Sequence, residues 1–401
     1  MKILVFSQCY YPERFLINDI TAELVRRGNE VTVITGYPNY PKGEIYPEYK
    51  DKKIKCEEIN GVKVYRTDII PRGKNKIKLF LNYLSYKKNA YKTAKFLSGF
   101  DIVYCYQLTP VMQLSPAIKY AKKHNLKLVC YCLDLAPMSG ERLLKKFKIL
   151  NAFYKRNSKR LYNACDKIAV TSKSFIEYLN KVNGLPTDKL VYLPQHAPEN
   201  FTLSDLSKPL GVNKTLVYAG NVGKGTGLKT LILAANELKK QGAEGFNIEI
   251  CGDGNLKSDL ISLVNELKLN DTVKFVNGVA MSDMPKVYSR ADALIITLRK
   301  GQITVPGKLQ AYMATGKPVI GAMSGSGKDL IEEADCGVCA EAEDYTGLAN
   351  LMKDYLKNPS DYQILGENGR KYFLNNFTLK THVDGLEKIF TEQIHDGTKT
   401  D

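Results

Sequence analysis

The chain has 401 residues, of which 44% are hydrophobic and 25% charged, as in a folded globular protein rather than a disordered one. This length exceeds what one hydrophobic core usually serves, so two domains are expected. No run approaches the roughly 20 apolar residues needed to span a membrane. The first residues also lack the pattern of a signal peptide. We therefore expect a cytoplasmic protein.

The net charge of +16, from 58 basic and 42 acidic residues, is unevenly distributed. Residues 72–95 contain eight Lys or Arg and no acid, and residues 142–160 contain eight more. Apolar side chains recur between them at helical spacing, which is typical of a helix lying on an anionic membrane surface. Ordinary solvated helix faces are the alternative. Because no recognition motif accompanies the charge, we expect no nucleic acid as a partner.

The nine cysteines and four histidines do not indicate a metal site. Cys130 and Cys132 are separated by one residue, which is not zinc spacing. Five cysteines lie in or beside apolar runs, where a free thiol behaves as a small hydrophobe: Cys105, Cys130, Cys132, Cys165 and Cys251. We expect free thiols, no metal and no cofactor.

The first half of the chain alternates short apolar runs with helical patterns. Predicted strands are 3–6, 31–35, 62–66, 102–105, 126–132 and 167–171. Predicted helices include 18–27, 78–97 and 111–124. The first of these has Asn18 as its expected start and Gly28 as its expected stop. This alternation predicts βαβ units around a parallel sheet.

Residues 193–212 interrupt the alternation with a stretch rich in Pro, Ser and Asn, which we interpret as a linker. Strands are predicted again at 215–219, 246–251, 273–276, 293–297 and 318–320. We expect an α/β protein with two Rossmann-like, doubly wound parallel-sheet domains, 1–195 and 196–375, facing each other across a cleft. A last segment, 376–401, is expected to be a helix that packs back on the first domain and frays at its end.

A glycine-rich segment, Tyr218-Ala-Gly-Asn-Val-Gly-Lys-Gly-Thr-Gly227, follows a predicted strand and precedes a predicted helix at 228–238. Glycines allow the backbone to approach an anion closely, and a helix start offers unpaired N–H groups. The pattern therefore indicates an anion site, with a simple tight turn as the alternative.

The segment 304–320 is more specific. Pro306 and Gly307 favour a helix start, Lys308 stands in the first helical turn, and Gly316 ends a short helix before an apolar run. A lysine at a helix N-terminus is electrostatically unfavourable unless an anion binds there. The alternative is an exposed lysine beside an ordinary helix–strand turn.

Two further loops follow predicted strands. They are Ile250-Cys-Gly-Asp-Gly254 and Phe275-Val-Asn-Gly-Val279. From the residues alone, Asp253 is either part of a ligand site or a cap for the helix that begins near Asn255.

Together these loops resemble the donor site of the retaining family 4 glycosyltransferases, which have the GT-B architecture. The resemblance implies that the diphosphate of a nucleotide-sugar donor binds at Gly220, Asn221, Gly223, Lys224 and Lys308. It also implies that the nucleotide base lies along Gly252, Asp253, Gly278 and Val279.

The first half is similar to the branch of this family that builds surface polysaccharides such as capsule, O-antigen and exopolysaccharide. The segments that carry this similarity are 10–19, 28–36 and 37–43, and the whole resemblance covers roughly residues 1–390. Members of the branch commonly use UDP-linked N-acetylated sugars and lipid-diphosphate acceptors. The resemblance thus implies a UDP-sugar donor and a lipid-linked or glycan acceptor, met on the inner face of the cell membrane.

The chain departs from the family pattern at three positions. Asn221 stands where many members have an arginine. Ala311 stands where many have the second of two glutamates, and the first falls near Ile303. The glutamates usually invoked at the donor sugar and the ribose are therefore missing. The diphosphate assignment carries over to this chain and the sugar contacts do not.

No Asp-x-Asp motif occurs in the chain, so cations and N–H groups, rather than a metal, are expected to stabilise the departing diphosphate. The candidates are Lys308, Lys224 and the amides near Gly223. Asp134, after a predicted strand, is the candidate proton acceptor for the acceptor hydroxyl. It is alternatively a cap of its own turn, or an orienting group if the leaving phosphate takes the proton.

These features predict a metal-independent, retaining hexosyltransferase in bacterial surface-polysaccharide synthesis. Two other classes stay open. A catalytically silent partner subunit would keep the fold without activity, as the departures at Asn221 and Ala311 allow. A sugar-nucleotide epimerase would need acid–base carboxylates and histidines, which four scattered histidines hardly supply.

Overall fold

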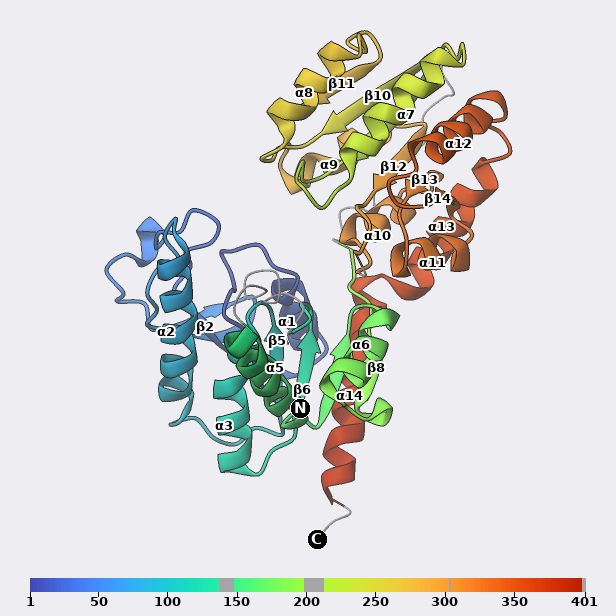
Figure 1. The fold of residues 1–401 in the computed structure, drawn as a ribbon. Coiled ribbons are helices and arrows are strands. Elements are labelled where there is room, and N and C mark those ends of the chain that lie inside the picture. Colours follow the sequence, from blue (N-terminus) through green and yellow to red (C-terminus); the bar gives the residue numbers. More distant parts are fainter. Residues whose placement is uncertain (137–147, 198–212, 303, 399–401) are drawn as a thin grey trace. The chain divides into compact units, whose positions relative to one another are not determined.

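The computed structural model describes residues 1–136, 148–197, 213–302 and 304–398. It forms two compact α/β units (Figure 1). The first unit contains Met1–Pro194 together with His382–Asp401, and the second contains Gln195–Thr381. Each unit is described separately below.

The N-terminal unit is built on an eight-stranded sheet with the order β3-β4-β2-β1-β5-β6-β7-β8. The strands are β1 (Lys2–Phe6), β2 (Glu30–Gly36), β3 (Cys56–Ile59), β4 (Val62–Thr67), β5 (Ile102–Gln107), β6 (Leu128–Cys132), β7 (Lys167–Val170) and β8 (Leu190–Tyr192). All neighbours are parallel except β3 and β4, which are antiparallel. The helices of the unit are α1 (Ile17–Arg26), α2 (Lys76–Ala94), α3 (Leu114–His124), α5 (Lys148–Asn163), α6 (Lys173–Asn183) and α14 (Leu379–Thr398).

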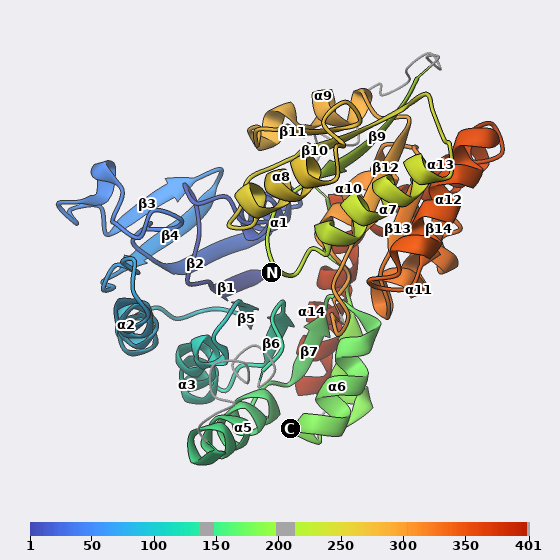
Figure 2. The same cartoon turned by 45° about the horizontal axis from the view of Figure 1, so that its top comes forward.

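Helices cover both faces of this sheet, with α2 and α3 on the same side (Figure 2). In the register of β1 and β5, Val5 lies opposite Tyr104, so Phe6 and Tyr104 point to opposite faces. Phe6 packs on Tyr120 of α3, and Tyr104 packs on Phe390 of α14. Coverage on both faces explains why β1, β5 and β6 are continuous apolar runs rather than alternating ones.

The C-terminal unit contains a six-stranded parallel sheet with the order β11-β10-β9-β12-β13-β14. Its strands are β9 (Lys214–Ala219), β10 (Phe246–Cys251), β11 (Val273–Val276), β12 (Ala293–Thr297), β13 (Val319–Ala322) and β14 (Gly337–Ala340). Its helices are α7 (Leu228–Lys240), α8 (Lys257–Glu266), α9 (Met284–Ser289), α10 (Gly307–Ala314), α11 (Ser326–Glu333), α12 (Tyr345–Lys357) and α13 (Gln363–Asn376).

Alternating side chains of β9 divide the core of this unit into two layers. Leu216 and Tyr218 pack with α7, α8 and α12 on one face. Val217 and Ala219 pack with α9, α10, α11 and α13 on the other. Helices on both faces of a parallel sheet are the arrangement predicted from the sequence, and the carboxyl ends of the strands then open at one edge.

The predicted strands agree with the structure to within two residues at their ends. The short strands β3, β8 and β14 were not predicted, because three or four residues carry too little periodicity. The expected helix start at Asn18 is wrong. Helix α1 begins at Ile17 without a side-chain cap, and Asn18 instead accepts from the amide of Tyr11 and donates to the carbonyl of Glu13. The expected stop at Gly28 is confirmed by its φ of 86° after the last turn.

Helix α14 contacts the N-terminal unit through charged groups as well as through aromatic packing. Arg27, after α1, donates to Asp384 at 2.6 Å and to Glu387 at 2.9 Å. Asn29 also donates to Glu387, at 2.8 Å. The guanidinium is mostly buried, so these charge-assisted bonds hold the last helix against α1.

We expect Arg27→Gln to loosen α14, because Asp384 and Glu387 lose their shared cation. Hydrogen bonds to charged groups contribute about 2 kcal/mol, which corresponds to roughly 30-fold faster amide exchange in a locally opening helix. Hydrogen–deuterium exchange of α14 peptides measures this effect. Lys2→Gln is the control, since its ion pair with Glu30 is solvent-exposed and contributes little. Unchanged exchange of α14 in Arg27→Gln would contradict the assigned role of Arg27.

Candidate functional site

Three loops and one helix meet at the carboxyl edge of the C-terminal sheet. The loops follow β9, β10 and β11, and the helix is α10. They enclose a cavity of about 560 Å³. Its lining residues are Ala219, Gly220, Asn221, Cys251, Gly252, Asp253, Gly278, Val279, Met284, Tyr288, Gly307, Lys308 and Ala311. Three segments that the sequence marked separately therefore form one site, at the place where parallel α/β sheets bind ligands.

The first two loops are joined by backbone hydrogen bonds. The amide of Gly220 donates to Cys251 and the amide of Val222 donates to Asp253, both at 2.9 Å. A Cβ atom on Gly252 would overlap the carbonyl of Gly220, so this approach requires glycine. These two amides are thus occupied within the protein. The amides of Asn221 and Gly223 donate no hydrogen bond to any described residue. Of the two residues, Asn221 lines this cavity and Gly223 does not.

Helix α10 is positioned by a tyrosine in its last turn. Tyr312 is fully buried, and its hydroxyl accepts from the amide of Ala219 at 2.8 Å. This bond fixes the helix to the end of β9. The N-cap residue, Pro306, provides no side-chain cap, and its carbonyl accepts from the amide of Leu309 at 2.8 Å. The amides of Gly307 and Lys308 donate to no described residue and keep their hydrogen-bonding capacity. Lys308 stands in this uncapped first turn, as predicted.

The ammonium of Lys308 reaches the end of β9. Its Nζ donates to the hydroxyl of Tyr218 at 2.5 Å and lies 3.9 Å from the centroid of the same ring. The Tyr218 hydroxyl in turn donates to the carbonyl of Asn221 at 2.8 Å. A Cβ atom on Gly220, whose φ is 143°, would lie 2.8 Å from Nζ. Glycine at this position is therefore what allows the lysine to enter.

The position of Lys308 is electrostatically unfavourable without a ligand. Its ammonium forms no salt bridge with a carboxylate anywhere in the described part of the chain. Burial lowers the pKa of Lys308 to about 7, since the charged form loses water and gains no counter-ion. The start of α10 adds a positive dipole end beside it. The site is built to receive negative charge.

The other side of the cavity carries little charge. Cys251, Met284 and Tyr288 provide apolar surface, and Val279 is partly exposed beside them. Such a wall suits a flat, mostly apolar group held by backbone contacts.

Asp253 ties two of the loops together. Its carboxylate accepts from the amide of Gly278 at 2.9 Å and from Lys257 at 2.8 Å. The Lys257 hydrogen bond, followed by that of Gly278, lowers the pKa of Asp253. The residue does not act as the N-cap of α8, which is Leu256. Asp253 thus lines the cavity and also holds the Gly278 loop in place.

Lys224 is not among the residues that line this cavity. It lies with Gly223 and Arg299 at a second cavity of about 500 Å³, at the start of α7. The loop bends there because Thr226 donates from both its amide and its hydroxyl to the carbonyl of Gly223. Of the two lysines expected at the diphosphate, the structure brings only Lys308 to the cavity of the three loops.

Asp134 belongs to the N-terminal unit, two residues after β6. Its carboxylate accepts from the amide of Thr109 at 3.0 Å and from the hydroxyl of the same residue at 2.9 Å. Thr109 follows the neighbouring strand β5, so the carboxylate holds that loop rather than its own turn. Pro137, at the end of the predicted motif, lies outside the described residues. One carboxylate oxygen of Asp134 is engaged in this way, which orients the group.

Ala311 is buried and lines the cavity, where the family pattern has a glutamate. Ile303, near the other missing glutamate, lies outside the described residues. The sequence analysis also missed Tyr218 as the partner of Lys308, and Met284 and Tyr288 as wall residues. Tyr218 was hidden by its place inside an apolar strand. The other two lie on α9, a single helical turn without a motif.

The cysteines of the apolar runs are free and buried. Within the described ranges, no three His, Cys, Asp or Glu side chains lie close enough together to hold a metal ion. No helix of the described chain combines the length and apolarity that a membrane-spanning segment requires.

Two family models match the chain. The model for group 1 glycosyl transferases covers residues 206–372, and the model for glycosyltransferase family 4 covers residues 16–195. A putative colanic acid biosynthesis glycosyl transferase, WcaI of Escherichia coli K12, is 24% identical over 418 residues, covering 96% of this chain and 100% of the relative.

Two solved structures share the fold over nearly the whole chain. Sucrose-phosphate synthase from Thermosynechococcus elongatus matches with a TM-score of 0.75 and 17% identity, over 98% of this chain and 99% of the other. Anabaena Alr3699/HepE, solved in complex with UDP and glucose, matches with a TM-score of 0.69 and 17% identity over the same shares. The chain therefore has the GT-B fold, with two parallel-sheet units, and each unit matches a glycosyltransferase family model over most of its length.

Proposed function

We propose that the protein is a retaining glycosyltransferase that moves a sugar from a UDP-sugar to a lipid-linked or glycan acceptor in bacterial surface-polysaccharide synthesis. The observation that carries this proposal is the ammonium of Lys308, half-buried at an uncapped helix start and without a carboxylate partner. A diphosphate supplies the missing negative charge. The N-acetylated hexose rests on the resemblance of the sequence to the surface-polysaccharide branch.

Breaking the bond between the sugar and the diphosphate leaves negative charge on the leaving group. Lys308, the amides of Gly307 and Lys308 at the start of α10, and the amide of Asn221 belong to residues that line the cavity and are proposed to receive it. Fixed donors of this kind stabilise a developing anion without reorganisation. We propose that this set acts without a metal ion. Lys224 contributes to it only if its loop moves when the donor binds.

The apolar wall formed by Cys251, Met284 and Tyr288 is proposed to hold the base, with Gly252 and Gly278 contacting it through the backbone. The complex of Anabaena Alr3699/HepE with UDP and glucose supports uridine as the base. WcaI, named for colanic acid biosynthesis, supports a polysaccharide product. Because Ala311 offers no polar atom, recognition of the donor sugar depends on other groups.

The acceptor hydroxyl must lose a proton during transfer. In a retaining reaction the leaving phosphate can take this proton, and Asp134 then orients the hydroxyl instead of accepting the proton. Its second carboxylate oxygen is available for this contact, since both hydrogen bonds from Thr109 engage the same oxygen. We propose Asp134 as this acceptor-orienting group.

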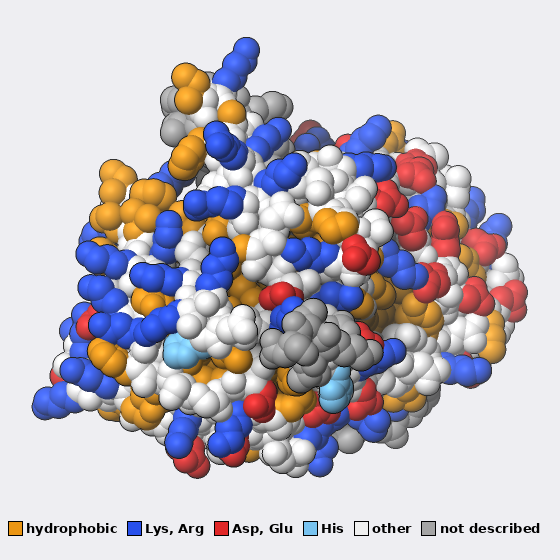
Figure 3. Space-filling view, turned by 90° about the horizontal axis from the view of Figure 1, so that it is seen from below, with side chains coloured by type: hydrophobic (Ala, Val, Ile, Leu, Met, Phe, Trp, Pro, Cys, Tyr) orange, Lys and Arg blue, Asp and Glu red, His pale blue; other side chains and the backbone are white. Residues whose placement is uncertain are grey.

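We further propose that α2 places the enzyme on an anionic membrane. Its residues Ile77, Phe80, Leu81 and Leu84 are exposed and recur at helical spacing. Lys and Arg side chains lie beside hydrophobic ones, with few acids, in the left part of the space-filling view, where α2 lies (Figure 3). The second basic segment is only partly described, since residues 142–147 fall outside the described ranges. An apolar stripe flanked by lysines suits an anionic lipid surface.

Lys308→Ala is expected to lower turnover on the order of 100-fold or more, as the loss of one oxyanion donor usually does. Release of UDP from a panel of UDP-sugars, with and without acceptor lipid extracts, measures the effect. Lys274→Ala, on the exposed edge of β11, is the control. A wild-type protein that binds UDP-sugars without releasing UDP would favour a silent subunit, and an isomerised nucleotide sugar would indicate an epimerase.

UDP binding at pH 8 is expected to take up a large part of one proton. Because the pKa of Lys308 is about 7 in the free protein, most of the side chain is neutral there, and the bound diphosphate raises this pKa. Affinity is therefore highest below pH 7 and falls by up to about tenfold per pH unit above it. Calorimetry in buffers of different ionisation enthalpy measures the uptake. A proton uptake that persists in Lys308→Met would refute this assignment.

The double variant Ile77→Ser/Phe80→Ser is expected to lose at least roughly tenfold in binding to vesicles that contain phosphatidylglycerol, since each apolar side chain contributes about 1.5–3 kcal/mol on burial. Co-sedimentation measures the bound fraction. Ile364→Ser is a matched control, because Ile364 on α13 is as exposed as Phe80, at 53% against 52%. Equal binding of the double variant and the control would exclude α2 as the membrane contact.

A further inference from the structure

A second cation without a counter-ion lies at the carboxyl edge of the N-terminal sheet. Arg72 stands between β4 and α2 and is half-buried. Its guanidinium carbon lies 5.1 Å from the ring centroid of Tyr40 and 6.0 Å from that of Tyr83. No Asp or Glu of the described chain lies within salt-bridge distance of it. The cation lies over the ring of Tyr40, and the phenol of Tyr83 also contacts it through a side-chain hydrogen bond. The guanidinium has five N–H donors, so others stay available for a ligand.

The loops that hold Arg72 are built on a buried carboxylate. The amide of Arg72 donates to the side chain of Asn39 at 2.9 Å. The amides of Asn39 and Tyr40 both donate to Glu13 at 2.6 Å. Glu13 is 2% exposed, and its burial raises its pKa. This network fixes the backbone around the cation before any ligand arrives, which lowers the entropy lost on binding.

Tyr83 links Arg72 to the proposed acceptor-orienting group. Burial raises the pKa of Tyr83, and its phenol also responds to the charges of Arg72 and Asp134. Tyr83 therefore lies within electrostatic reach of both Arg72 and Asp134. Asp134 follows β6, at the carboxyl edge of the same sheet.

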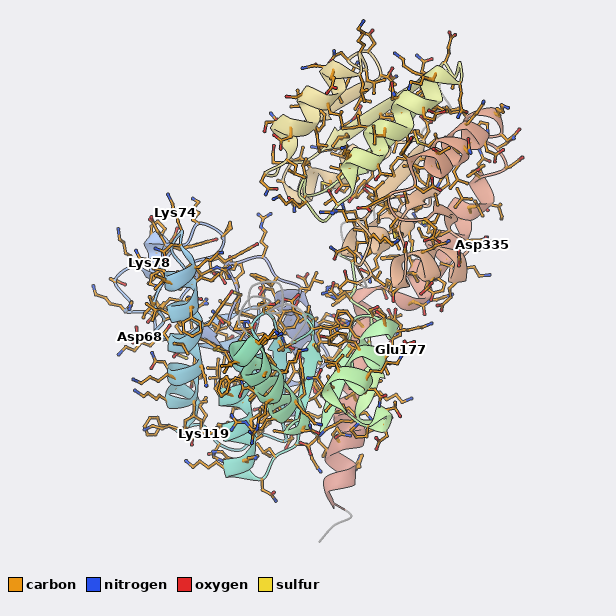
Figure 4. The ribbon with its side chains drawn as sticks, in the orientation of Figure 1. Asp68, Lys74, Lys78, Lys119, Glu177 and Asp335 are labelled. Carbon is orange, nitrogen blue, oxygen red and sulfur yellow. The ribbon has the colours of Figure 1, made fainter. Side chains whose placement is uncertain are left out.

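A cavity of about 1170 Å³ lies beside the backbone at this point, since Pro71 and Gly73 line it, while the side chain of Arg72 itself does not. Its lining contains four lysines and two glutamates, together with apolar residues such as Ile45 and Ile70. Two of the lysines, Lys74 and Lys78, lie together at the N-terminal end of α2 (Figure 4). The cavity thus combines apolar surface with an excess of positive charge.

We propose that Arg72, held between Tyr40 and Tyr83, binds the phosphate or diphosphate of an acceptor whose apolar chain follows the adjoining cavity. This inference rests on the proposed function, because it assigns the acceptor of the same reaction. A guanidinium binds two phosphate oxygens at once, which suits a group that must be oriented and not only attracted. Arg72 is a positioning residue here and does not contact the reacting atoms.

The test measures binding of farnesyl diphosphate to the full chain by calorimetry in saturating UDP. Arg72→Gln is expected to weaken this binding on the order of tenfold or more, and Arg72→Lys by a smaller factor because the charge is kept. Lys119→Gln is the matched control. Lys119 also lies over a tyrosine ring, that of Tyr91 at 4.1 Å, but on α3, far from Lys74 and Lys78 (Figure 4). Unchanged melting temperatures show that the variants are folded.

Two further measurements distinguish the contribution of the phosphate from that of the apolar chain, and the site at Arg72 from the site at Lys308. Inorganic pyrophosphate is expected to bind at least tenfold more weakly than farnesyl diphosphate. Equal binding of the two compounds would support a phosphate site at Arg72 but refute the proposal that an apolar chain binds in the cavity. Lys308→Met, which weakens UDP binding under the proposed function, is expected to leave farnesyl diphosphate binding unchanged. If Lys308→Met abolishes it, or if Arg72→Gln leaves it intact, the site at Arg72 is refuted, whereas a failure of UDP binding alone concerns only the donor proposal.

Discussion

The proposed donor site depends on holding a lysine ammonium where water is scarce and no carboxylate neutralises it. Desolvation of an unpaired cation is costly, so the protein must compensate through packing elsewhere. Lys308 is kept in place because Tyr312 anchors its helix to β9 and because Gly220 leaves room for Nζ. The hydroxyl of Tyr218 is its hydrogen-bond partner within the protein. A cation prepared in this way binds a diphosphate more strongly than a solvated one, because much of its desolvation is already complete.

The N-terminal unit repeats this physical arrangement with different residues. Its sheet edge holds Arg72 between aromatic rings, while the carboxylates of Glu13 and Asp134 are engaged by amides and a hydroxyl. In the N-terminal unit, these carboxylates form hydrogen bonds with amides and a hydroxyl instead of a salt bridge with Arg72. Two sheets that bury both faces leave only their strand ends for function, so both cations occur at a carboxyl edge.

Two positions where the chain departs from the family pattern, Asn221 and Ala311, line the cavity. Ala311 is buried at the position of a missing glutamate, and Asn221 replaces an arginine on the loop that Tyr218 contacts through the backbone. Lys308 then remains as the cation that lines the cavity. Under the proposed function, recognition of the diphosphate rests on this cation and on amides, and recognition of the base rests on apolar wall residues. Neither set of contacts uses the side chains at positions 221 and 311, so both are compatible with the changes at these positions.

Local sequence determined the sheets, the glycine loops and the lysine in the first turn of α10, because these depend on periodicity and on neighbours within a few residues. It also indicated the fold, since βα alternation permits few topologies. Contacts between distant residues were decided by the tertiary structure alone. Tyr218 and Lys308 are 90 residues apart, and Thr109 and Asp134 are 25 apart. Whether Lys308 or Lys224 reaches the cavity depends on how a loop bends and on where a helix is anchored, and no spacing in the chain encodes that choice.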